Sequence, residues 1–402
     1  MLVLSVGNRY PPWSVGGYEA TWAASVAQLR AAGHTVRVLT TGPDPTDHPA
    51  PGPCPLYVHR ELAWYWRAHA FARPRLADTI RLERANAAVI ARHLRTFAPD
   101  VVMWWAMGGM SLSLLEQVRR AGVPAVAVVG DDWLAYGRQV DGWSRRFTGL
   151  GRVVAPVAEW LTGLPARLRP DRAARWSMNS RHTLHAAWAA AGPLGNASIA
   201  HPGVDPERFA PAPPRPEWEW RLLYCGRIDP RKGIATAVQA LAELPPQATL
   251  AIHGDGDEGH RADLVQLARR LGVADRVAFS SSDHAHVPGT YAACDALVFP
   301  VTWQEPWGLV PLEAMAVRRP VIATRAGGGP AEYLSDGENC LQFAPGDAAG
   351  LVAAIVRLAE EPALRSALVA SGARTAAELT ERAFHEALAG ELALAVQHGP
   401  LP

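Results

Sequence analysis

The chain has 402 residues, which is too long for one ordinary hydrophobic core and suits two domains of roughly 200 residues each. Its formal net charge is +1, so the composition excludes proteins that bind nucleic acid through bulk positive charge. Four widely spaced cysteines without a C-x-x-C pair fit neither a zinc site nor a disulfide framework, so we expect reduced thiols and a cytoplasmic location.

The first half of the chain alternates short apolar runs with helical patterns, which predicts parallel strands in a doubly wound α/β sheet. A helix is expected at Glu19–Ala32, after a glycine turn. The predicted strands are Leu2–Val6, Thr35–Thr40, Asp100–Trp105 and Ala125–Val129. The apolar start is therefore interpreted as a strand rather than a signal peptide, and no apolar run reaches the ~18 residues of a membrane span.

Two segments rich in arginine and aromatic residues, His59–Arg81 and Asp141–Arg175, fit this alternation poorly. We interpret both as amphipathic helices around the mouth of a cleft. They are either ordinary surface helices whose arginine stems cover apolar neighbours, or they contact an acceptor or a membrane surface. The second alternative would place the protein peripherally at the inner face of a membrane.

A proline-rich stretch at residues 210–218 cannot continue a helix or a central strand, so we expect the linker between two domains there. The predicted domains are residues 1–209 and 219–375, and residues 376–402 should form a C-terminal helix that packs back toward the first domain. The strands expected after the linker are Arg221–Cys225, Thr249–His253, Val277–Ser280, Ala296–Val301 and Pro320–Thr324. The helices expected there are Ile234–Leu244, Ala262–Leu271 and Leu309–Val317. A ligand of two such domains would lie between them, at the carboxyl ends of the strands.

The most specific segment is the string E-P-W-G-L-V-P-L-E-A-M-A, which begins at Glu305. A strand ends, a short loop carries Glu305, and a helix begins near Leu309, just after Gly308. The free backbone N–H groups at a helix start favour a phosphate or the hydroxyls of a polar ligand. Glu313 lies about one helical turn further on, so the two carboxylates could reach one elongated ligand.

A second loop, Cys225–Gly233, also lies between a predicted strand and a predicted helix. Arg227 and Lys232 could converge there on a diphosphate, with arginine as a fork and lysine as a compact charge. Lys232 is the only lysine among 39 cationic residues, which suggests a role that arginine cannot fill, although chance survival is the alternative.

The first predicted strand leads into a third loop that contains Gly16 and Gly17. Glycines at a helix start allow a ligand to approach the backbone closely. A glycine pair alone is equally typical of a plain tight turn.

Taken together, these strings resemble the retaining nucleotide-sugar glycosyltransferases of family four, which have the GT-B fold of two Rossmann-like domains facing a central cleft. The resemblance covers nearly the whole chain and is most specific between Arg221 and Gly346. Further matching strings are His201-Pro-Gly-Val-Asp205 and His253-Gly-Asp-Gly256.

The resemblance implies roles for the residues already named. Arg227 and Lys232 would bind the donor diphosphate, and Glu305 would contact hydroxyls of the donor sugar. The backbone N–H groups near Glu305 would also face the donor, and Glu313 would bind the ribose. The loop Ser281–Val287 would flank the base. The donor-binding set implied in this way is Gly16, Gly17, Gly308, Leu309, Val310 and Glu313.

Some positions depart from the family pattern. The family often has histidine followed by aspartate after an N-terminal strand, where this chain has Gly130-Asp131-Asp132. An ungapped comparison places Gly130 at the histidine, whereas a one-residue shift places Asp131 there. Asp131 and Asp132 are therefore candidate contacts to the sugar or the acceptor. Arg318 stands where glycine is usual, and Phe384 where tryptophan is common; we interpret both as structural.

We therefore predict a retaining glycosyltransferase that moves a sugar from a nucleoside-diphosphate sugar to an acceptor hydroxyl, in natural-product or envelope-glycan biosynthesis. The alternatives are a sugar-nucleotide epimerase and a catalytically inactive protein that binds a nucleotide sugar. We expect no cofactor and no metal, because Asp255 and Asp257 fit turn chemistry and His284 and His286 have no third ligand in view. The donor base, donor sugar, acceptor and oligomeric state stay open.

Overall fold

The computed structural model describes residues 1–13, 16–44, 54–67, 70–215, 217–282 and 286–401. The chain forms two compact units: unit 1 comprises Met1–Ala200 with His385–Pro402, and unit 2 comprises His201–Phe384. The domain boundaries and the linker expected from the sequence stay predictions.

Unit 1 contains a parallel sheet in which strand order runs outward in two directions from β1. Its seven strands, in the order β3-β2-β1-β6-β7-β8-β9, are β1 (Leu2–Val6), β2 (Thr35–Thr41), β3 (Val58–Leu62), β6 (Val101–Trp104), β7 (Ala125–Val129), β8 (Arg175–Met178) and β9 (Ala197–Ile199). Its helices are α1 (Gly17–Ala31), α2 (Leu76–Phe97), α3 (Ser113–Arg120), α4 (Trp133–Val140), α5 (Ala155–Thr162), α6 (Pro170–Ala173), α7 (Arg181–Ala191) and most of α14 (Glu381–His398). The last of these is tied to β8 by an ion pair between Arg175 and Glu391 at 2.8 Å.

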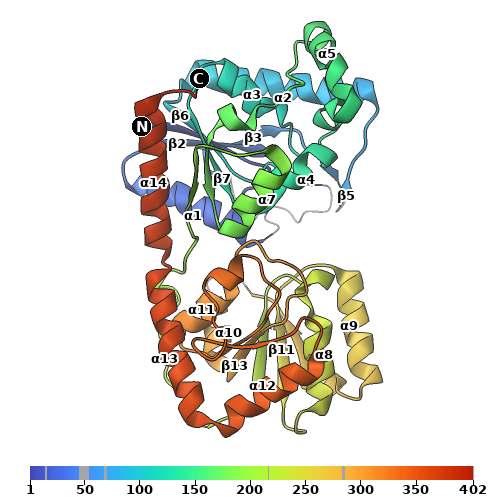
Figure 1. Ribbon diagram of the computed structural model, residues 1–402, viewed down its shortest axis with the longest axis vertical. Coiled ribbons are helices and arrows are strands. Elements are labelled where there is room, and N and C mark those ends of the chain that lie inside the picture. The colour runs from blue at the N-terminus through green and yellow to red at the C-terminus, as the bar shows by residue number, and fades with distance from the viewer. Residues whose placement is uncertain (14–15, 45–53, 68–69, 216, 283–285, 402) are drawn as a thin grey trace. The chain divides into compact units, whose positions relative to one another are not determined.

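Unit 2 repeats the arrangement with a smaller parallel sheet (Figure 1). Its six strands, in the order β12-β11-β10-β13-β14-β15, are β10 (Arg221–Cys225), β11 (Thr249–His253), β12 (Val277–Ser280), β13 (Ala296–Phe299), β14 (Val321–Thr324) and β15 (Leu341–Phe343). Its helices are α8 (Ile234–Glu243), α9 (Glu258–Arg270), α10 (Val287–Ala293), α11 (Val310–Ala316), α12 (Ala348–Glu360) and α13 (Pro362–Glu378).

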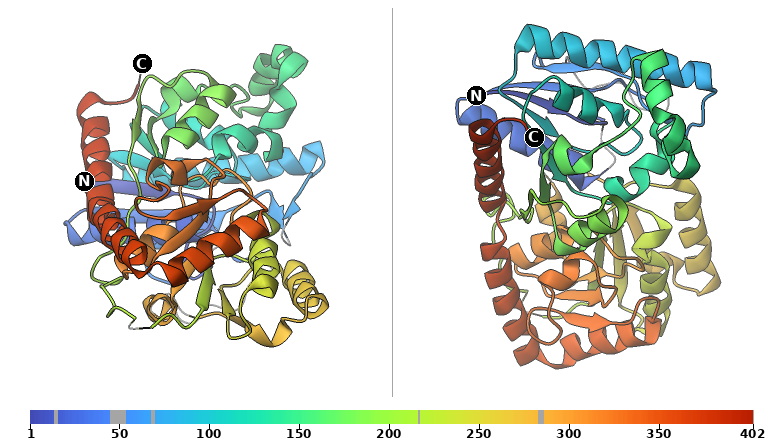
Figure 2. Two further views of the ribbon diagram at one scale, coloured as in Figure 1. Left: turned by 60° about the horizontal axis from the view of Figure 1, so that its bottom comes forward. Right: turned by 45° about the horizontal axis from the view of Figure 1, so that its top comes forward.

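Helices cover both faces of each sheet (Figure 2), which explains why the central strands β6, β7 and β13 are apolar and buried at every position. Along β10, Leu222 and Tyr224 pack into one core cluster, while Leu223 and Cys225 pack into another on the opposite face. Two-sided burial therefore produces the short, continuous apolar runs that predicted these strands from the sequence.

The expectation of an amphipathic helix over His59–Arg81 is wrong. The described part of this segment contains most of β3 and a short antiparallel pair, β4 (Trp66–Arg67) with β5 (Ala70–Phe71), and a helix begins only at Leu76. Aromatic side chains stabilise this pair across the strands, since the rings of Trp66 and Phe71 lie 4.8 Å apart. The segment Asp141–Arg175 is helical only in short pieces, which are two 3₁₀ helices, η1 (Ser144–Phe147) and η2 (Gly149–Val154), with α5 and α6.

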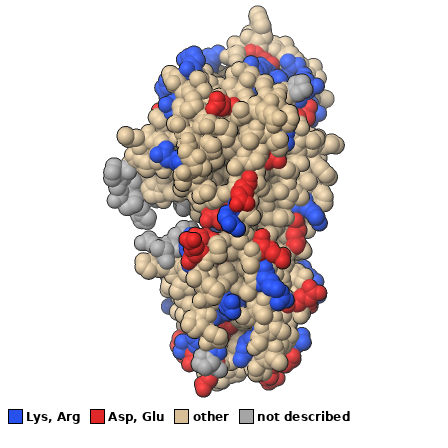
Figure 3. Space-filling view, turned by 90° about the vertical axis from the view of Figure 1, so that its left-hand side faces the viewer, with Lys and Arg blue, Asp and Glu red and all other residues tan. Residues whose placement is uncertain are grey.

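Charged side chains of both signs are interspersed over the face drawn in Figure 3, in keeping with the near-zero net charge. Among the described residues, no helix is long and apolar enough to cross a membrane.

Candidate functional site

The candidate donor site lies where the strand order of unit 2 reverses. β10 and β13 are neighbours, and the chain continues from β10 to β11 on one side and from β13 to β14 on the other. In doubly wound sheets, ligands bind at such a reversal, outside the carboxyl ends of the strands. One loop carries Arg227 and Lys232, and the other carries Glu305.

Asp229 organises the loop after β10. Its carboxylate accepts a hydrogen bond from the backbone N–H of Arg231 at 2.9 Å, which caps the 3₁₀ turn Pro230–Lys232. Hydrogen bonds from Arg231 are the main reason why the pKa of Asp229 lies well below its ordinary value. The same carboxylate lies 3.2 Å from the guanidinium of Arg227, whose buried Nε has no hydrogen-bond partner among the described residues.

Lys232 and Glu305, which are 73 residues apart in the sequence, form an ion pair of 2.6 Å between Nζ and Oε2. The side chain of Lys232 is 16% exposed and that of Glu305 is 14% exposed, so water screens this ion pair weakly. The indole N–H of Trp303 donates to the same carboxylate oxygen at 2.9 Å. Glu305 is thus held by two donors, and one of them stays in place if Lys232 turns toward a bound anion.

Glycines allow the backbone of the Glu305 loop to approach a neighbouring loop closely. A Cβ atom on Gly328 would lie 2.4 Å from the carbonyl oxygen of Glu305, and the N–H of Gly329 donates to that oxygen at 2.8 Å. Gly233, at the start of α8, adopts a φ of +67°, and a Cβ there would lie 1.9 Å from the carbonyl oxygen of Pro300. Any other residue at these glycines would separate the loops that bring Lys232 to Glu305.

The loop after Glu305 enters α11 through Gly308, whose φ of +84° favours glycine. The first α-helical hydrogen bond runs from the N–H of Glu313 to the carbonyl of Leu309 at 2.9 Å. The N–H groups of Gly308, Leu309 and Val310 precede this bond, as expected for donors that point out of a helix start.

Glu313 lies on α11 beside Tyr291, whose hydroxyl donates to Oε2 of Glu313 at 2.5 Å. Burial raises the pKa of Glu313, and this hydrogen bond partly offsets the effect. The second carboxylate of the E-P-W-G-L-V-P-L-E string is therefore a positioned acceptor rather than a surface charge.

In unit 1 the two candidate glycines lie at the start of α1. Gly16 donates its N–H to Oε2 of Glu19 at 2.9 Å, and Gly17 is the first helical residue. Apart from the chain neighbours and the helix backbone, no atom of the described residues lies within 4 Å of the place where a Cβ would stand on either glycine. Gly16 has an extended φ of 179°, which any residue adopts, so the conformation itself does not require glycine.

The segment after β7 brings Asp131 close to this helix start. Oδ2 of Asp131 accepts a hydrogen bond from the hydroxyl of Tyr136 at 2.7 Å, while Oδ1 is buried without a hydrogen-bond partner among the described residues. Burial, with smaller contributions from Asp132 and Glu19, raises the pKa of Asp131 to about 6. Asp132 immediately precedes α4.

Gly130 leaves room for the ring of Tyr18. A Cβ on Gly130 would lie 2.6 Å from that ring, and the hydroxyl of Tyr18 donates to the carbonyl of Val128. Under the ungapped comparison, the ring of Tyr18 therefore lies against the position where the family often has histidine.

Two further expectations concern the edges of the donor site. Asp257 caps α9 by accepting the N–H of His260 at 3.0 Å, as the turn interpretation predicts. The loop expected to flank the base, Ser281–Val287, is only partly covered, because residues 283–285, including His284, lie outside the described residues. Its beginning is tied to β11 by a contact of 3.1 Å between Ser282 and His253.

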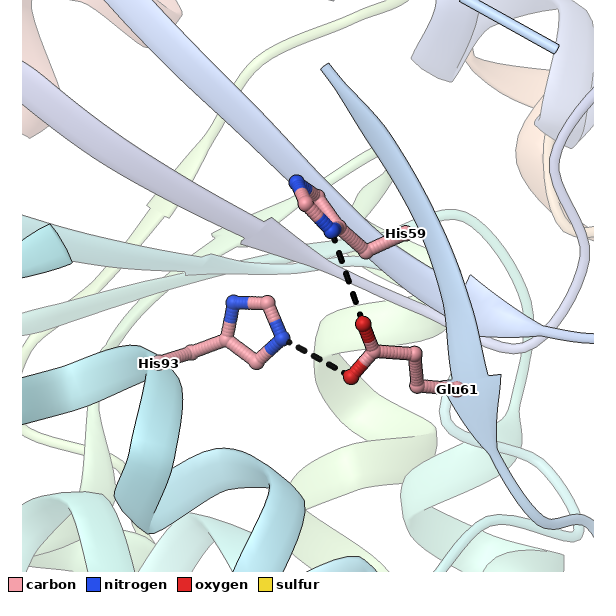
Figure 4. A group of neighbouring side chains, drawn as sticks. All are labelled: His59, Glu61 and His93. Carbon is pink, nitrogen blue, oxygen red and sulfur yellow. Dashed lines mark hydrogen bonds and ion pairs between the residues drawn. The ribbon is translucent and has the colours of Figure 1, made fainter. Parts of the chain in front are cut away.

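One group of side chains in unit 1 has the composition of a metal site. Glu61 lies 3.5 Å from Nδ1 of His59 and 3.2 Å from Nε2 of His93 (Figure 4). However, Arg92 forms an ion pair with Glu61, and Arg37 lies 3.4 Å from Nδ1 of His93. Since a guanidinium only donates, Nδ1 of His93 accepts and its Nε2–H donates to Glu61. Both nitrogens of His93 are therefore used in hydrogen bonds, so a hydrogen-bonded network accounts for the contacts of this histidine.

Sequence reasoning missed the residues that position the candidate groups. Trp303 and Tyr291 hold the two glutamates, Asp229 holds Arg227, and Tyr136 holds Asp131. Trp303 stands two residues before Glu305, which is the one signal that could have identified it. Tyr291 and Tyr136 lie outside the strings that indicated a site. Asp229 lies within the loop Cys225–Gly233, where only Arg227 and Lys232 were assigned a role.

Comparisons with known proteins identify the family and the fold. Residues 205–375 match the family model described as glycosyl transferases group 1. The chain is 31% identical over 381 residues to the glycogen synthase of Mycobacterium tuberculosis, which covers 90% of this chain and 87% of that protein. It is 39% identical over 154 residues to the lipopolysaccharide core biosynthesis glycosyltransferase LpsE of Rhizobium meliloti, covering 38% of this chain and 44% of that one.

Solved structures share the fold over the whole chain. Anabaena HepE in complex with UDP-glucose superposes with a TM-score of 0.71 at 20% identity and covers 98% of this chain and 99% of its own. Sucrose-phosphate synthase from Thermosynechococcus elongatus gives a TM-score of 0.73 at 22% identity, with 97% and 98% covered.

Proposed function

The chain belongs to the group 1 glycosyltransferases, the retaining family-four enzymes with the GT-B fold, and from this premise we propose that it moves a sugar from a nucleoside-diphosphate sugar to an acceptor hydroxyl. The observation that carries the proposal is the ion pair between Lys232 and Glu305 at the switch point of unit 2. A cation and a carboxylate are in direct contact there, which supports a site that binds phosphate and sugar hydroxyls side by side.

In the proposed reaction, Lys232 and Arg227 bind the donor diphosphate. Negative charge accumulates on the phosphate oxygens as the bond to the sugar breaks, so positioned cations lower the barrier. Lys232 carries a single charge on a flexible stem, and it can shift from Glu305 toward a phosphate while Trp303 continues to hold the carboxylate. The unpartnered Nε of Arg227 is a further donor for the same anion.

Glu305 is proposed to accept hydrogen bonds from hydroxyls of the donor sugar, and it does not act as a nucleophile. The acceptor hydroxyl attacks from the face that the diphosphate leaves, and the departing phosphate takes the proton, so the anomeric configuration is retained. The N–H groups of Gly308, Leu309 and Val310 contact the donor beside Glu305, and Glu313 binds the ribose hydroxyls while Tyr291 fixes its orientation.

Unit 1 is proposed to supply the remaining contacts. Gly16 and Gly17 offer open backbone at the start of a helix of 15 residues, which suits the phosphates and sugar of the donor. Asp131 and Asp132 are proposed to contact the sugar or the acceptor. The names of the relatives, a glycogen synthase and a lipopolysaccharide core glycosyltransferase, support a carbohydrate acceptor in envelope-glycan or natural-product biosynthesis.

We propose that the protein is located in the cytoplasm and that it contacts the inner face of a membrane peripherally. All four cysteines are free thiols, and three of them are buried, which suits a reducing compartment.

A thermal-shift panel of nucleoside diphosphates tests the donor site. We expect one nucleotide to raise the melting temperature of the wild type, Lys232→Ala to lose most of that shift, and Glu313→Gln to reduce it. Arg231→Ala is the matched control, because it removes the adjacent cation, half of which is exposed. A shift that survives in Lys232→Ala would contradict the assignment, whereas binding without any sugar transfer would indicate an inactive donor-binding protein.

A further inference from the structure

A run of large apolar side chains lies on the surface of unit 1, in the segment formed by η2 and α5 (residues 149–162). Among the described residues, 13 large apolar side chains are exposed, and six of them fall in this segment. They are Leu150, Val153, Val154, Val157, Trp160 and Leu161. The indole of Trp160 is 82% exposed and the side chain of Leu150 is 93% exposed, which is unusual for such large groups.

The burial of side chains along α5, which is labelled in Figure 1, reverses the usual amphipathic pattern. Its small residues face the protein: Ala155 is fully buried in a cluster with Trp143 and Leu164, and Ala158 packs against the same cluster. Its large residues, Val157, Trp160 and Leu161, face solvent. Folding of unit 1 gains little from these exposed side chains, so a concentrated patch of this kind marks an interaction surface.

The one acid of the η2–α5 segment is neutralised by neighbouring groups, whereas its one arginine is exposed. Glu159, the one acidic residue in the η2–α5 segment, accepts hydrogen bonds from the backbone N–H groups of Ala166 and Arg167, and Arg120 lies 3.1 Å away. These donors lower the pKa of Glu159 to about 2 despite its partial burial, so its charge is balanced within the protein. Arg152 of η2 is exposed and forms no ion pair with any described residue. Arg138, Arg145 and Arg146, which precede η2 in the sequence, are partly buried, and Arg146 donates to the carbonyl of Gly142 at 3.1 Å.

We propose that the η2–α5 segment docks on a membrane surface that contains anionic lipids. Its apolar side chains would enter the boundary between headgroups and acyl chains, and the exposed Arg152 would meet lipid phosphates. A second copy of the chain is the weaker occupant, because it would bring another cationic Arg152 to the interface rather than an anion. Docking uses no residue of the donor site, so it stands independently of the proposed reaction.

Co-sedimentation of the full chain with lipid vesicles tests the proposal. We expect binding to phosphatidylcholine vesicles that contain phosphatidylglycerol, weaker binding to phosphatidylcholine alone, and weaker binding in high salt. The double substitution Trp160→Ser with Leu161→Ser should reduce the partition coefficient about tenfold, since it removes two inserting side chains. Arg152→Gln should reduce binding to the anionic vesicles and leave binding to neutral vesicles unchanged.

Trp188→Ser is the matched control, because Trp188 is an exposed tryptophan on α7 of the same unit. It should bind vesicles as the wild type does. The melting temperature and the shift caused by a nucleoside diphosphate should be unchanged in all variants, which separates loss of docking from loss of folding or of the donor site. Equal binding by the wild type and the double variant would overturn the proposal. So would self-association in sedimentation velocity that the double variant abolishes while vesicle binding persists.

Discussion

The two units share a doubly wound parallel sheet, but they differ in whether the acid that follows a strand is paired with a cation. In unit 2, Glu305 meets Lys232 at 2.6 Å, so a carboxylate and an ammonium are paired and largely shielded from solvent. In unit 1, Asp131 accepts hydrogen bonds from the neutral hydroxyl of Tyr136 and the backbone N–H of Trp133, and burial raises its pKa to about 6. The same topology therefore supports one site with balanced charge and another whose charge changes close to neutral pH.

The largest effect is expected from removing the cation of the balanced site. Lys232→Ala should slow the release of nucleoside diphosphate from a nucleotide sugar on the order of 10²–10³-fold, because a positioned charge is lost where negative charge develops. The rate can be measured as hydrolysis of the donor in water, which needs no acceptor. Arg231→Ala should stay close to the wild-type rate.

A double variant separates charge balance from catalysis. Lys232→Ala leaves the carboxylate of Glu305 without its cation, so the free energy of unfolding should fall by about 1–3 kcal/mol. Adding Glu305→Gln should restore stability, since the amide needs no counter-charge, but it should not restore the rate. Recovery of both properties would contradict a direct role of Lys232 in the reaction.

The free energy of unfolding should depend on pH because of Asp131. The pKa of Asp131 is about 6 in the folded chain against an ordinary value of 3.8, so the folded state binds more protons between these values. Stability contributed by the protonated acid is present at low pH and is lost as the pH rises through that window. Asp131→Asn should therefore gain about 2.4 kcal/mol of unfolding free energy over the wild type on going from about pH 4 to about pH 7.5.

Urea denaturation of both proteins at the two pH values measures this difference. Asparagine keeps an acceptor for Tyr136, so the hydrogen bond is retained and the comparison isolates the charge. A stability difference that does not change with pH would show that Asp131 is ionised without cost in the fold.

Much of unit 2 could be predicted because its signals are local. Buried strands such as Arg221–Cys225 form continuous apolar runs, and the loops that follow them carry the charged residues in the same short strings. The contact between Lys232 and Glu305 could not be derived from the sequence, since it depends on β10 and β13 being neighbours across 73 residues of chain. The family resemblance assigned both residues to one ligand, but not to each other.

Unit 1 was harder to predict because its features depend on packing between distant segments. The segment His59–Arg81 looked helical from its composition, but cross-strand pairing of Trp66 with Phe71 overrides that pattern. The space beside Gly130 is taken by Tyr18, 112 residues earlier in the sequence, and no local string indicates this contact. The exposed face of α5 likewise becomes evident only when the inward side of the helix is known.

A smaller effect tests whether Tyr18 determines what can stand at position 130. Gly130→Ala should lower the free energy of unfolding by about 2 kcal/mol, because the new Cβ would lie 2.6 Å from the Tyr18 ring. Combining it with Tyr18→Ala should remove most of that additional cost. Gly195→Ala, at a site with open space, serves as the control in the same urea titrations. Additive costs in the double variant would show that the ring of Tyr18 does not exclude a side chain at this position.

The smallest effect is expected at Arg318 in unit 2, a departure from the family pattern that affects only the backbone conformation. Arg318 adopts a φ of +61°, a left-handed conformation that favours the glycine usual at this position in the family. Arg318→Gly should therefore raise the free energy of unfolding by about 1 kcal/mol. Arg318→Ala should give no such gain, because alanine has the same Cβ in the same conformation. The nucleotide-induced thermal shift should be the same in both variants, because strain confined to the end of α11 leaves Lys232, Glu305 and Glu313 in place. A changed thermal shift would show that the backbone conformation at Arg318 affects the donor site itself.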